Sequence, residues 1–319
     1  MRFAATVPLA GCALSEHAGT LAALAAAGYS DFWTQEVRGF DALTPLAALA
    51  AQAPGARLGA AIAGIYSRGP ALLAMQAAAV AEAAPGRFAL GIGTSSETIV
   101  EGWNAARMEK PVARMRDTLR FLRAALAGER IDAAFETFAV RSFALARAPA
   151  SSPPLLVAAL REQMLALAGA EADGVCLGLL SAADVRRVLP TFVAAGGRGK
   201  EVFLRVAVFA LADAQRARRM ARKLIAPYLA AEPYARFHAA LGRSAEVSRV
   251  AAALRASDRE AAFAALPDDW VDGLVVHGTP DACRAQLAAF VEAGVTTLCI
   301  DVVASDGPWL ETQRAVLPR

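Results

Sequence analysis

The chain has 319 residues, of which 56% are hydrophobic, and its formal net charge is +3. The weak charge and the lack of basic runs interleaved with aromatic residues argue against a nucleic-acid-binding protein, and no apolar run approaches the ~20 residues of a membrane helix. Three histidines and four cysteines without a CxxC pair offer few metal donors, so we expect a cytoplasmic protein with reduced thiols, without a metal site and without nucleic-acid or membrane partners.

Short apolar segments alternate with longer helical patterns along the chain. The first helical pattern has Ser15 as a predicted N-cap and Gly28 as its stop, and Pro45 and Pro70 mark the first turns of the next two helices. Thr279 is predicted to cap the last helix, which begins at Pro280. The predicted strands are residues 2–9, 31–36, 57–65, 87–93, 154–160, 173–179, 201–211 and 296–303. The other predicted helices lie at 41–53, 69–84, 110–128, 161–172, 182–197 and 212–230.

Two segments depart from this alternation. Residues 130–153 have alternating β character followed by a loop, and we interpret them as an inserted hairpin or extended segment. Residues 232–270 are helical, charged and less regular, which indicates an insertion over one face of the molecule. We expect this insertion and the loop at 96–110 to shape a pocket.

The eight apolar segments predict an α/β fold. Their β-branched character is typical of strands that are buried on both faces of a parallel sheet. Eight strand–helix units in about 300 residues favour a (β/α)8 TIM barrel with insertions, with a doubly wound open sheet as the alternative. We find no internal repeat and no low-complexity linker, so we expect one domain over residues 1–319.

In a barrel the active site lies at the C-terminal ends of the strands. Only Glu36 and Asp301 carry charge in the predicted strand ends, which are residues 7–9, 34–36, 64–66, 93–95, 158–160, 177–179, 208–209 and 301. A site so poor in acids and bases argues against hydrolysis. It favours a reaction in which an organic cofactor carries the chemistry.

Several motifs, in order and over nearly the whole chain, carry a resemblance to a known family. They are "GIYSRGP" at the end of the third strand, "GRFALGIG", the helix opening "KPVARMR", "PLLVAALREQMLALAGAEADGV" and "GTPDACRAQLAAFVEAGVTTLCIDV". Together they resemble the bacterial luciferase-like superfamily. The likeness is greatest to its deazaflavin-dependent branch, which includes methylenetetrahydromethanopterin reductase.

The resemblance implies that coenzyme F420 or FMN binds at the C-terminal strand ends. In the deazaflavin branch a bulge with a non-prolyl cis peptide lies behind the ring, and the matching place here is Gly64–Ile65. The resemblance also implies that Gly91 and Gly93 let the backbone approach the ring. Thr94 and Ser95 could then donate hydrogen bonds to the cofactor. Alternatively, Ser95 or Ser96 caps a helix.

The resemblance also places the cofactor phosphate and the substrate. Phosphate would lie at the turns after the fifth and sixth strands, and Arg161 either contacts it or covers the helix surface. Glu36 would be the catalytic proton donor or a substrate anchor, with a surface carboxylate as the alternative. We interpret the histidines as packing or surface residues (His17 and His238) and as a turn residue (His277). The implied phosphate-binding residues are Ala159, Arg161, Gly178 and Leu179, and those lining the substrate pocket are Pro8, Gln35 and Tyr66.

The resulting hypothesis is a coenzyme F420-dependent oxidoreductase that transfers a hydride between the deazaflavin and a small organic substrate. An FMN-dependent monooxygenase is the close alternative. A cofactor-free barrel enzyme would need a lysine or an acid–base pair at a strand end, and Lys110, Lys200 and Lys223 lie on no predicted strand end. A non-catalytic flavin-binding protein is the remaining alternative. The family resemblance implies a homodimer.

Overall fold

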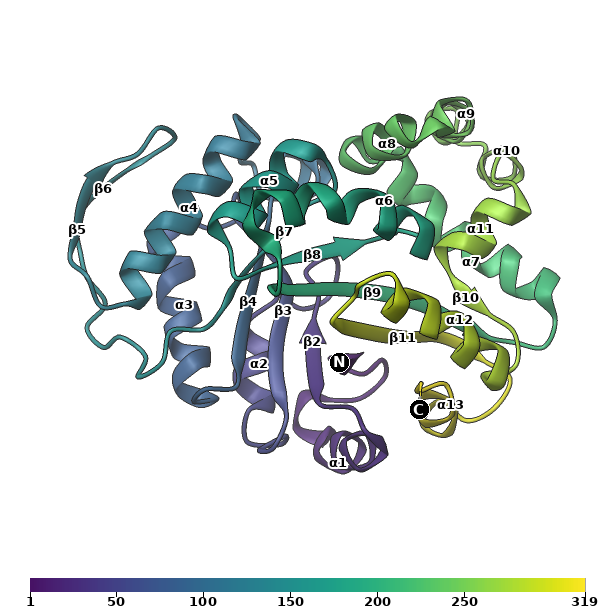
Figure 1. Ribbon diagram of the computed structural model, residues 1–319, viewed down its shortest axis with the longest axis horizontal. Helices are drawn as coiled ribbons and strands as arrows, with labels where there is room; N and C mark the ends of the chain where they lie inside the picture. The colour runs from purple at the N-terminus through teal and green to yellow at the C-terminus, as the bar shows by residue number, and fades with distance from the viewer. Residues whose placement is uncertain (319) are drawn as a thin grey trace.

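The structure, a computed structural model, describes residues 1–318 and contains a closed parallel barrel (Figure 1). Its strands run in the order β11, β1, β2, β3, β4, β7, β8 and β9, and the β8–β9 and β9–β11 pairings close the sheet on itself. This confirms the TIM-barrel prediction and excludes the open sheet. The barrel strands are β1 (Arg2–Thr6), β2 (Asp31–Thr34), β3 (Arg57–Gly64), β4 (Phe88–Gly93), β7 (Leu155–Ala158), β8 (Gly174–Gly178), β9 (Glu201–Ala210) and β11 (Thr297–Ser305).

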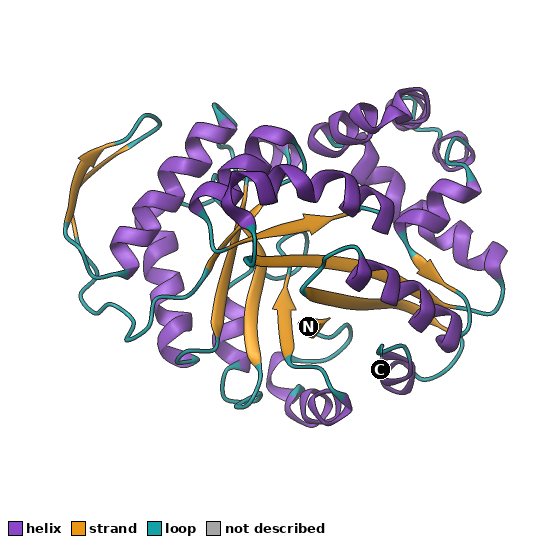
Figure 2. Cartoon of the chain, in the orientation of Figure 1, coloured by secondary structure: helices purple, strands orange, loops and turns teal. Residues whose placement is uncertain are grey.

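Helices surround the barrel (Figure 2). Gly28 ends the first helix with a φ of 114°, and Thr279 caps the last predicted one by accepting a hydrogen bond from the Ala282 amide. Ser15 is not the N-cap we predicted, because Leu14–Glu16 forms a separate 3-10 turn and the helix begins after His17. The helices are α1 (Ala18–Ala27), α2 (Thr44–Leu49), α3 (Pro70–Ala83), α4 (Pro111–Leu126), α5 (Glu162–Glu171), α6 (Ala182–Phe192), α7 (Ala214–Ala230), α12 (Pro280–Glu292) and α13 (Trp309–Ala315).

Both predicted insertions are present. Strands β5 (Ile131–Ala134) and β6 (Ala139–Phe143) form an antiparallel hairpin that projects beyond α4 in Figure 1. The second insertion contains α8 (Glu232–His238), α9 (Ser244–Arg255), α10 (Arg259–Ala264) and α11 (Asp268–Leu274), and in the figure α8–α10 gather at the opposite side of the molecule. The two-residue strand β10 (Val276–His277) and helix α13 are elements that the sequence pattern did not predict.

Side chains inside the barrel form three layers, because alternate residues of each strand face inward. The lower layer, at the N-terminal strand ends, contains Arg2, Asp31, Arg57, Gly174, Glu201 and Thr297. The middle layer contains Ala4, Trp33, Gly59, Ala89, Leu156, Cys176, Phe203 and Cys299. The upper layer, at the C-terminal strand ends, contains Thr6, Gln35, Ala61, Gly91, Ala158, Gly178, Arg205 and Asp301.

The middle layer is an apolar plug. The rings of Trp33 and Phe203 stack with centroids 4.3 Å apart, and both side chains are buried. Gly59 makes room for the indole, because a Cβ there would lie 2.3 Å from Trp33 Cδ2. The three buried cysteines and the partly exposed Cys12 are free thiols, as predicted.

Ion pairs close the lower end. Arg57 donates from Nη1 and Nη2 to the two carboxylate oxygens of Glu201 at 2.8 and 2.7 Å. Its Nη1 also lies 3.4 Å from Asp31 Oδ1, and Thr297 donates to Glu201 Oε1 at 2.6 Å. Burial alone would raise the pKa of Glu201, but the hydrogen bonds from Arg57 outweigh it and lower the pKa overall.

Candidate functional site

Solvent reaches the upper layer of the barrel interior. Every residue of the upper layer except Gly91 is partly exposed, whereas every residue of the middle layer is buried. The upper layer also divides into two halves. Strands β3, β4, β7 and β8 contribute small residues only, and we call this side the small half: Ala61, Gly91, Ala158 and Gly178. Strands β9, β11, β1 and β2 contribute polar residues, and we call this side the polar half: Arg205, Asp301, Thr6 and Gln35.

Arg205 reaches from β9 across the barrel to the ends of β2 and β3. Its Nη1 donates to Gln35 Oε1 at 3.0 Å and to the Ala61 carbonyl at 3.2 Å. Its Nη2 donates to the carbonyls of Thr34 at 2.9 Å and Trp33 at 3.4 Å. The buried Nε has no hydrogen-bond partner of ordinary geometry within residues 1–318, and the Cys299 thiol lies beside the guanidinium.

A non-prolyl cis peptide occurs on β3, as the resemblance implies, but at Ala61–Ile62. The predicted position, Gly64–Ile65, is therefore wrong by three residues. The pairing of β3 with β4 shifts between Ala60 and Ala63, so the irregularity lies inside the strand and regular pairing resumes before Gly64. Arg205 holds the carbonyl of this cis peptide, which links the bulge to the polar half of the upper layer.

Asp301 lies in the polar half, near the end of β11. Its backbone is in register with Ala207 of β9, and Arg205 is the opposite charge that acts on its carboxyl group. The hydroxyl of Thr6, which contacts Cys299 Sγ at 3.6 Å, also lies near the carboxyl group. Arg205 and the Thr6 hydroxyl are the groups that favour the ionised form of this carboxyl group. Burial raises the pKa of Asp301 more than Arg205 and Thr6 lower it.

Glu36, the predicted proton donor, differs from Asp301 because its hydrogen-bonding capacity is used. Arg68 binds both carboxylate oxygens, at 2.5 and 3.0 Å. Three further donors complete the set: the amides of Ala42 at 3.0 Å and Gly64 at 3.2 Å, and the hydroxyl of Ser67 at 3.3 Å. The carboxylate thus ties the end of β2 to the end of β3, which accounts for its conformation without a substrate.

The glycines of β4 are accounted for by packing of protein atoms. A Cβ at Gly91 would lie 2.4 Å from the Ala60 carbonyl oxygen, and one at Gly93 would lie 2.6 Å from Ile62 Cγ1. The glycines thus admit the bulged segment of β3 and the Ile62 side chain. Beyond β4, Ser95 has a φ of 63° and the Thr94 hydroxyl donates to the Ser95 carbonyl at 3.4 Å. Both residues are partly exposed beside the upper layer.

The alternative reading of this turn, a helix cap, applies to Ser96. Its hydroxyl accepts a hydrogen bond from the Ile99 amide at 3.4 Å, at the start of the short helix Thr98–Trp103. Ser95 makes no such bond within residues 1–318, so its side chain has no capping role.

Helices α5 and α6 begin just after strands β7 and β8 of the small half. Their N-termini differ, because side chains cap α6 but not α5. At α6 the Ser181 hydroxyl and the Asp184 carboxylate form a capping box, and Arg243 pairs with Asp184 at 2.9 Å. At α5 the preceding residue is Arg161, which makes no side-chain cap and is exposed. The amide donors of α5 are therefore the more available for an anion.

The other predicted phosphate-binding residues lie between the strand ends and these helices. Ala159 is buried and its amide donates to the Cys176 carbonyl at 3.1 Å. Gly178 and Leu179 are partly exposed, and Leu179 has a φ of 57°. Both residues therefore remain accessible beside the start of α6.

The residues predicted to line a substrate pocket lie in three different environments. Gln35 faces the barrel interior and accepts from Arg205. Pro8 follows a cis Val7–Pro8 bond just beyond β1 and is partly exposed. Tyr66 packs outward against the loop before α4, where its hydroxyl donates to the Glu109 carbonyl at 2.6 Å. Burial raises the pKa of Tyr66 to about 12, so the phenol stays neutral near pH 7.

Helix α7 and the helical insertion each contribute one tyrosine that the sequence pattern did not single out. Tyr228 of α7 and Tyr234 of α8 meet edge to face with centroids 5.6 Å apart. The Tyr234 hydroxyl would lie 3.6 Å from a Cβ at Gly178, so it faces the end of β8. The insertion therefore covers part of the upper layer.

The histidines have structural environments. His17 and His238 are buried, as the packing interpretation predicts. His17 accepts from the Leu9 amide at 2.8 Å, and His238 lies between Trp270 and Arg243. Burial, and then the charge of Arg243, lower the pKa of His238 to about 4. His277 pairs with Asp272 at 2.8 Å in β10, a strand and not the turn we predicted.

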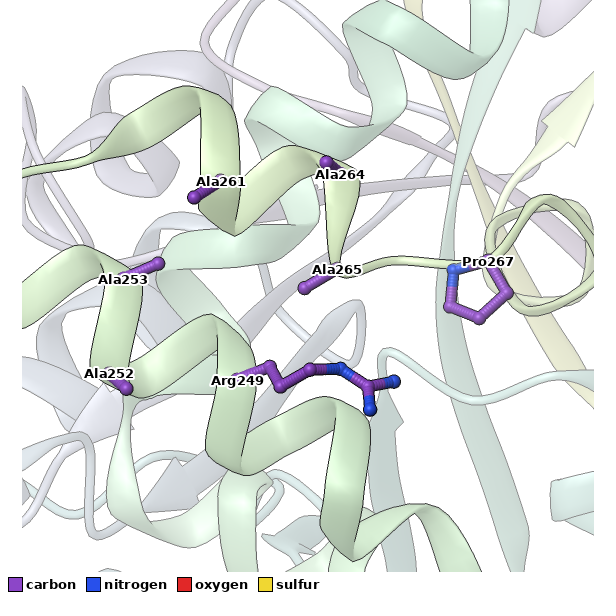
Figure 3. A pocket seen from close by; sticks show the side chains of 7 residues that line it. All are labelled: Arg249, Ala252, Ala253, Ala261, Ala264, Ala265 and Pro267. Atoms are coloured by element: carbon purple, nitrogen blue, oxygen red, sulfur yellow. The ribbon is translucent and has the colours of Figure 1, made fainter.

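Other features of the surface lack catalytic groups. The depression in Figure 3 lies between α9 and α10 and is lined by Arg249, Pro267 and alanine side chains. Within residues 1–318 no three histidine, cysteine or acidic side chains gather as a metal site. None of the helices described combines the length and the apolar character that crossing a bilayer requires.

Comparisons with known proteins agree with this geometry. A coenzyme F420-dependent oxidoreductase, so named, of Mycobacterium tuberculosis is 28% identical over 311 residues, covering 89% of this chain and 90% of that protein. The 5,10-methylenetetrahydromethanopterin reductase of Methanolobus tindarius is 25% identical over 281 residues, 85% of each chain.

The fold and the family are both established by these comparisons. The coenzyme F420-dependent tetrahydromethanopterin reductase of Methanopyrus kandleri has the same fold, with a TM-score of 0.81 over 99% of this chain and 96% of that one at 18% identity. The model of the luciferase-like monooxygenase family matches residues 2–297. The resemblance detected in the sequence is confirmed, and the chain belongs to the luciferase-like monooxygenase family.

Proposed function

We propose that the chain is a coenzyme F420-dependent oxidoreductase that transfers a hydride between the deazaflavin and a small organic substrate at the upper layer. The observation that carries this proposal is the division of the upper layer into a half of small residues and a polar half. A flat ring needs a surface without protruding side chains, and a substrate that gains or loses a proton needs polar groups opposite it.

The small half fits a planar ring. Ala61, Ala158 and Gly178 bring no side chain larger than a methyl group, and the Ala61–Ile62 bulge forms the adjoining wall. The available amides at the start of α5, with the exposed Arg161 beside them, would hold the cofactor phosphate. Thr94 and Ser95, which are partly exposed just after β4, would contact the cofactor. The deazaflavin would supply or accept the hydride, and this chain's residues would bind and orient it.

The remaining function classes receive less support. A cofactor-free enzyme with a lysine nucleophile is disfavoured, because Lys200 donates to the Gly169 carbonyl and Lys110 pairs with Glu136 outside the barrel. Lys223 lies exposed on α7. The FMN-dependent monooxygenase stays the second candidate, since the family that matches is named for that activity.

Titration of the purified protein with coenzyme F420 and, separately, with FMN tests the proposal. We expect saturable fluorescence changes with F420 and weaker or none with FMN. Binding of FMN alone would establish the second candidate, and binding of neither by the folded protein would overturn both.

The variant G178A adds a methyl group 3.6 Å from Tyr234 without a clash, so it should fold normally and bind F420 more weakly. G19A is the matched control, because nothing lies within 4 Å of a Cβ there.

We also propose that the chain is a single domain and a cytoplasmic homodimer that acts on a small molecule. Exposed apolar side chains support a dimer: Phe40, Trp103, and the pair Leu72 and Met75 on one face of α3. Light scattering after size exclusion measures the mass directly, and a monomer at micromolar concentration would contradict the dimer.

A further inference from the structure

We propose that His238 and Arg243 are positioning residues, which hold the turn between β8 and α6 in the conformation that lets it bind the cofactor. The inference rests on the proposed cofactor site and extends it to two residues of the helical insertion, outside the barrel interior. It gives the insertion a part in cofactor binding besides covering the upper layer.

The turn at residues 178–181 needs support from its surroundings. Leu179 has a φ of 57°, in the left-handed region that residues with a side chain rarely occupy. Such a conformation persists only where neighbouring groups enforce it. Within residues 1–318 the amides of Leu179 and Leu180 donate no backbone hydrogen bond, so the turn offers two donors. Successive free amides in a turn can bind an anion such as a phosphate group.

The helical insertion contacts Leu179 from two sides. The Leu179 side chain packs against the apolar cluster formed by α7 and by helices α9, α10 and α11. Its carbonyl group lies beside the imidazole of His238, the last residue of α8, and favours the protonated form of that ring. A hydrogen bond from His238 to this carbonyl would fix the peptide that follows Leu179, and with it the left-handed turn.

Arg243 determines which ring nitrogen of His238 carries the proton. Arg243 Nη1 lies 2.9 Å from His238 Nδ1, and because a guanidinium can only donate, Nδ1 accepts. Burial, and then the charge of Arg243, lower the pKa of His238 to about 4, so the ring is neutral near pH 7 and its one proton is on Nε2. This buried nitrogen has no partner of ordinary geometry within residues 1–318, which leaves the Leu179 carbonyl beside the ring as its acceptor.

The same guanidinium holds the other end of the turn. Arg243 donates to both carboxylate oxygens of Asp184, at 3.0 and 2.9 Å, and Asp184 closes the capping box with Ser181 at the start of α6. The indole of Trp270 packs against the guanidinium carbon at 5.4 Å and against the His238 ring at 5.3 Å, measured from its centroid. One cluster of the insertion therefore holds both ends of the turn.

Hydrogen exchange of the cofactor-free protein tests whether this cluster holds the turn. H238F cannot donate to the Leu179 carbonyl, and R243M also loses the pair with Asp184. In both variants the amides of residues 179–184 should exchange about 10-fold faster than in the wild type, the size of one lost hydrogen bond. H238Q keeps an N–H of nearly the same reach and should stay close to the wild type.

R249M is the matched control for these exchange measurements. Arg249 lies in the same insertion, but it is exposed and pairs with Glu246 of its own helix, so exchange in the turn should not change. If R243M does not fold, H238F still tests the proposal. Unchanged exchange of residues 179–184 in every folded variant of His238 and Arg243 would overturn it.

Two deazaflavins test what the turn does for the cofactor: F420 itself and its ribityl deazaflavin part, which has no phosphate. R243M should bind F420 about 10-fold more weakly than the wild type and bind the phosphate-free compound with an unchanged Kd. Equal weakening of both, or of neither, would overturn the proposal. A wild type that binds neither compound would instead overturn the proposed function and leave the exchange result standing, so the two failures are distinguishable.

Discussion

The two ends of the barrel interior contain the same residue types in opposite states. At the lower end Arg57 binds Glu201 through two hydrogen bonds and also meets Asp31, so cation and anions are paired. At the upper end the terminal nitrogens of Arg205 bind only carbonyl oxygens, and no ion pair joins Arg205 to Asp301 within residues 1–318. Strands β9 and β11 contribute residues to both the lower and the upper layer. On each of these strands the residue of the upper layer follows the residue of the lower layer by four positions.

This difference separates stability from chemistry. Paired and hydrogen-bonded charges at the N-terminal strand ends hold the barrel closed but have nothing left to offer a ligand. Unpaired groups at the C-terminal strand ends cost stability, and they are free to bind or to transfer a proton. Barrel position alone does not decide this, because Glu36 lies at the upper end and is nevertheless fully satisfied.

The largest effect should follow from breaking the lower end. R57M leaves the carboxylates of Glu201 and Asp31 without their cation, and removal of one partner of a buried pair costs about 3–5 kcal/mol. Arg57 keeps 14% side-chain exposure, so we expect the lower part of that range. Urea unfolding measures it. R147A, which breaks the exposed pair with Glu82, is the control and should stay within about 0.5 kcal/mol of the wild type.

The second effect concerns Glu36. E36Q turns an acceptor toward Arg68 into a donor, and loss of a hydrogen bond to a charged group costs about 1.5–3 kcal/mol. If Glu36 only positions the ends of β2 and β3, the unfolding free energy should fall while the pH profile of turnover keeps its shape. If E36Q instead had normal stability and its pH profile of turnover lost the acid or the base limb, Glu36 would be the proton donor.

The third effect is on cofactor affinity. R205M removes the donor that holds the Ala61 carbonyl behind the proposed ring site, so F420 should bind roughly 10-fold more weakly, the size of one lost hydrogen bond. The freed carbonyls lie at the partly hydrated end, where water can replace the guanidinium. We therefore expect a smaller loss of stability than in R57M. An equal loss of stability in R205M and R57M would show that both ends of the barrel interior serve the fold alone.

Most of the fold could be predicted from local patterns. Apolar segments bounded by Gly and Pro predict the barrel strands, and Gly28 and Thr279 end and begin helices as their chemistry requires. The cis peptide was placed three residues too late, since motif similarity locates a bulge only approximately and the register shift is set by pairing with β4.

The site was harder to predict than the fold. The end of the strand at 201–211 was placed at residues 208–209, so Arg205 was overlooked. The alternation Glu201, Phe203, Arg205 could have assigned it to the barrel interior. No pattern in the sequence could show that Arg68 would bind Glu36 or that four carbonyls would occupy Arg205. These contacts join residues as far as 172 positions apart, so only the folded chain reveals which carboxyl group is free.

The pH dependence of stability tests the contrast between the two ends most directly. The pKa of Glu201 lies below its ordinary value of 4.5, so its contribution to stability is present above that pH and is lost as the pH falls. The pKa of Asp301 is raised above 3.8, so its contribution is present in acid and is lost as the pH rises through the raised pKa. Unfolding free energies of wild type, E201Q and D301N should be measured across this range. E201Q should lose most stability at neutral pH, whereas D301N should gain on the wild type as the pH rises. If the difference in unfolding free energy from the wild type changed with pH in the same direction for both variants, the account would be contradicted.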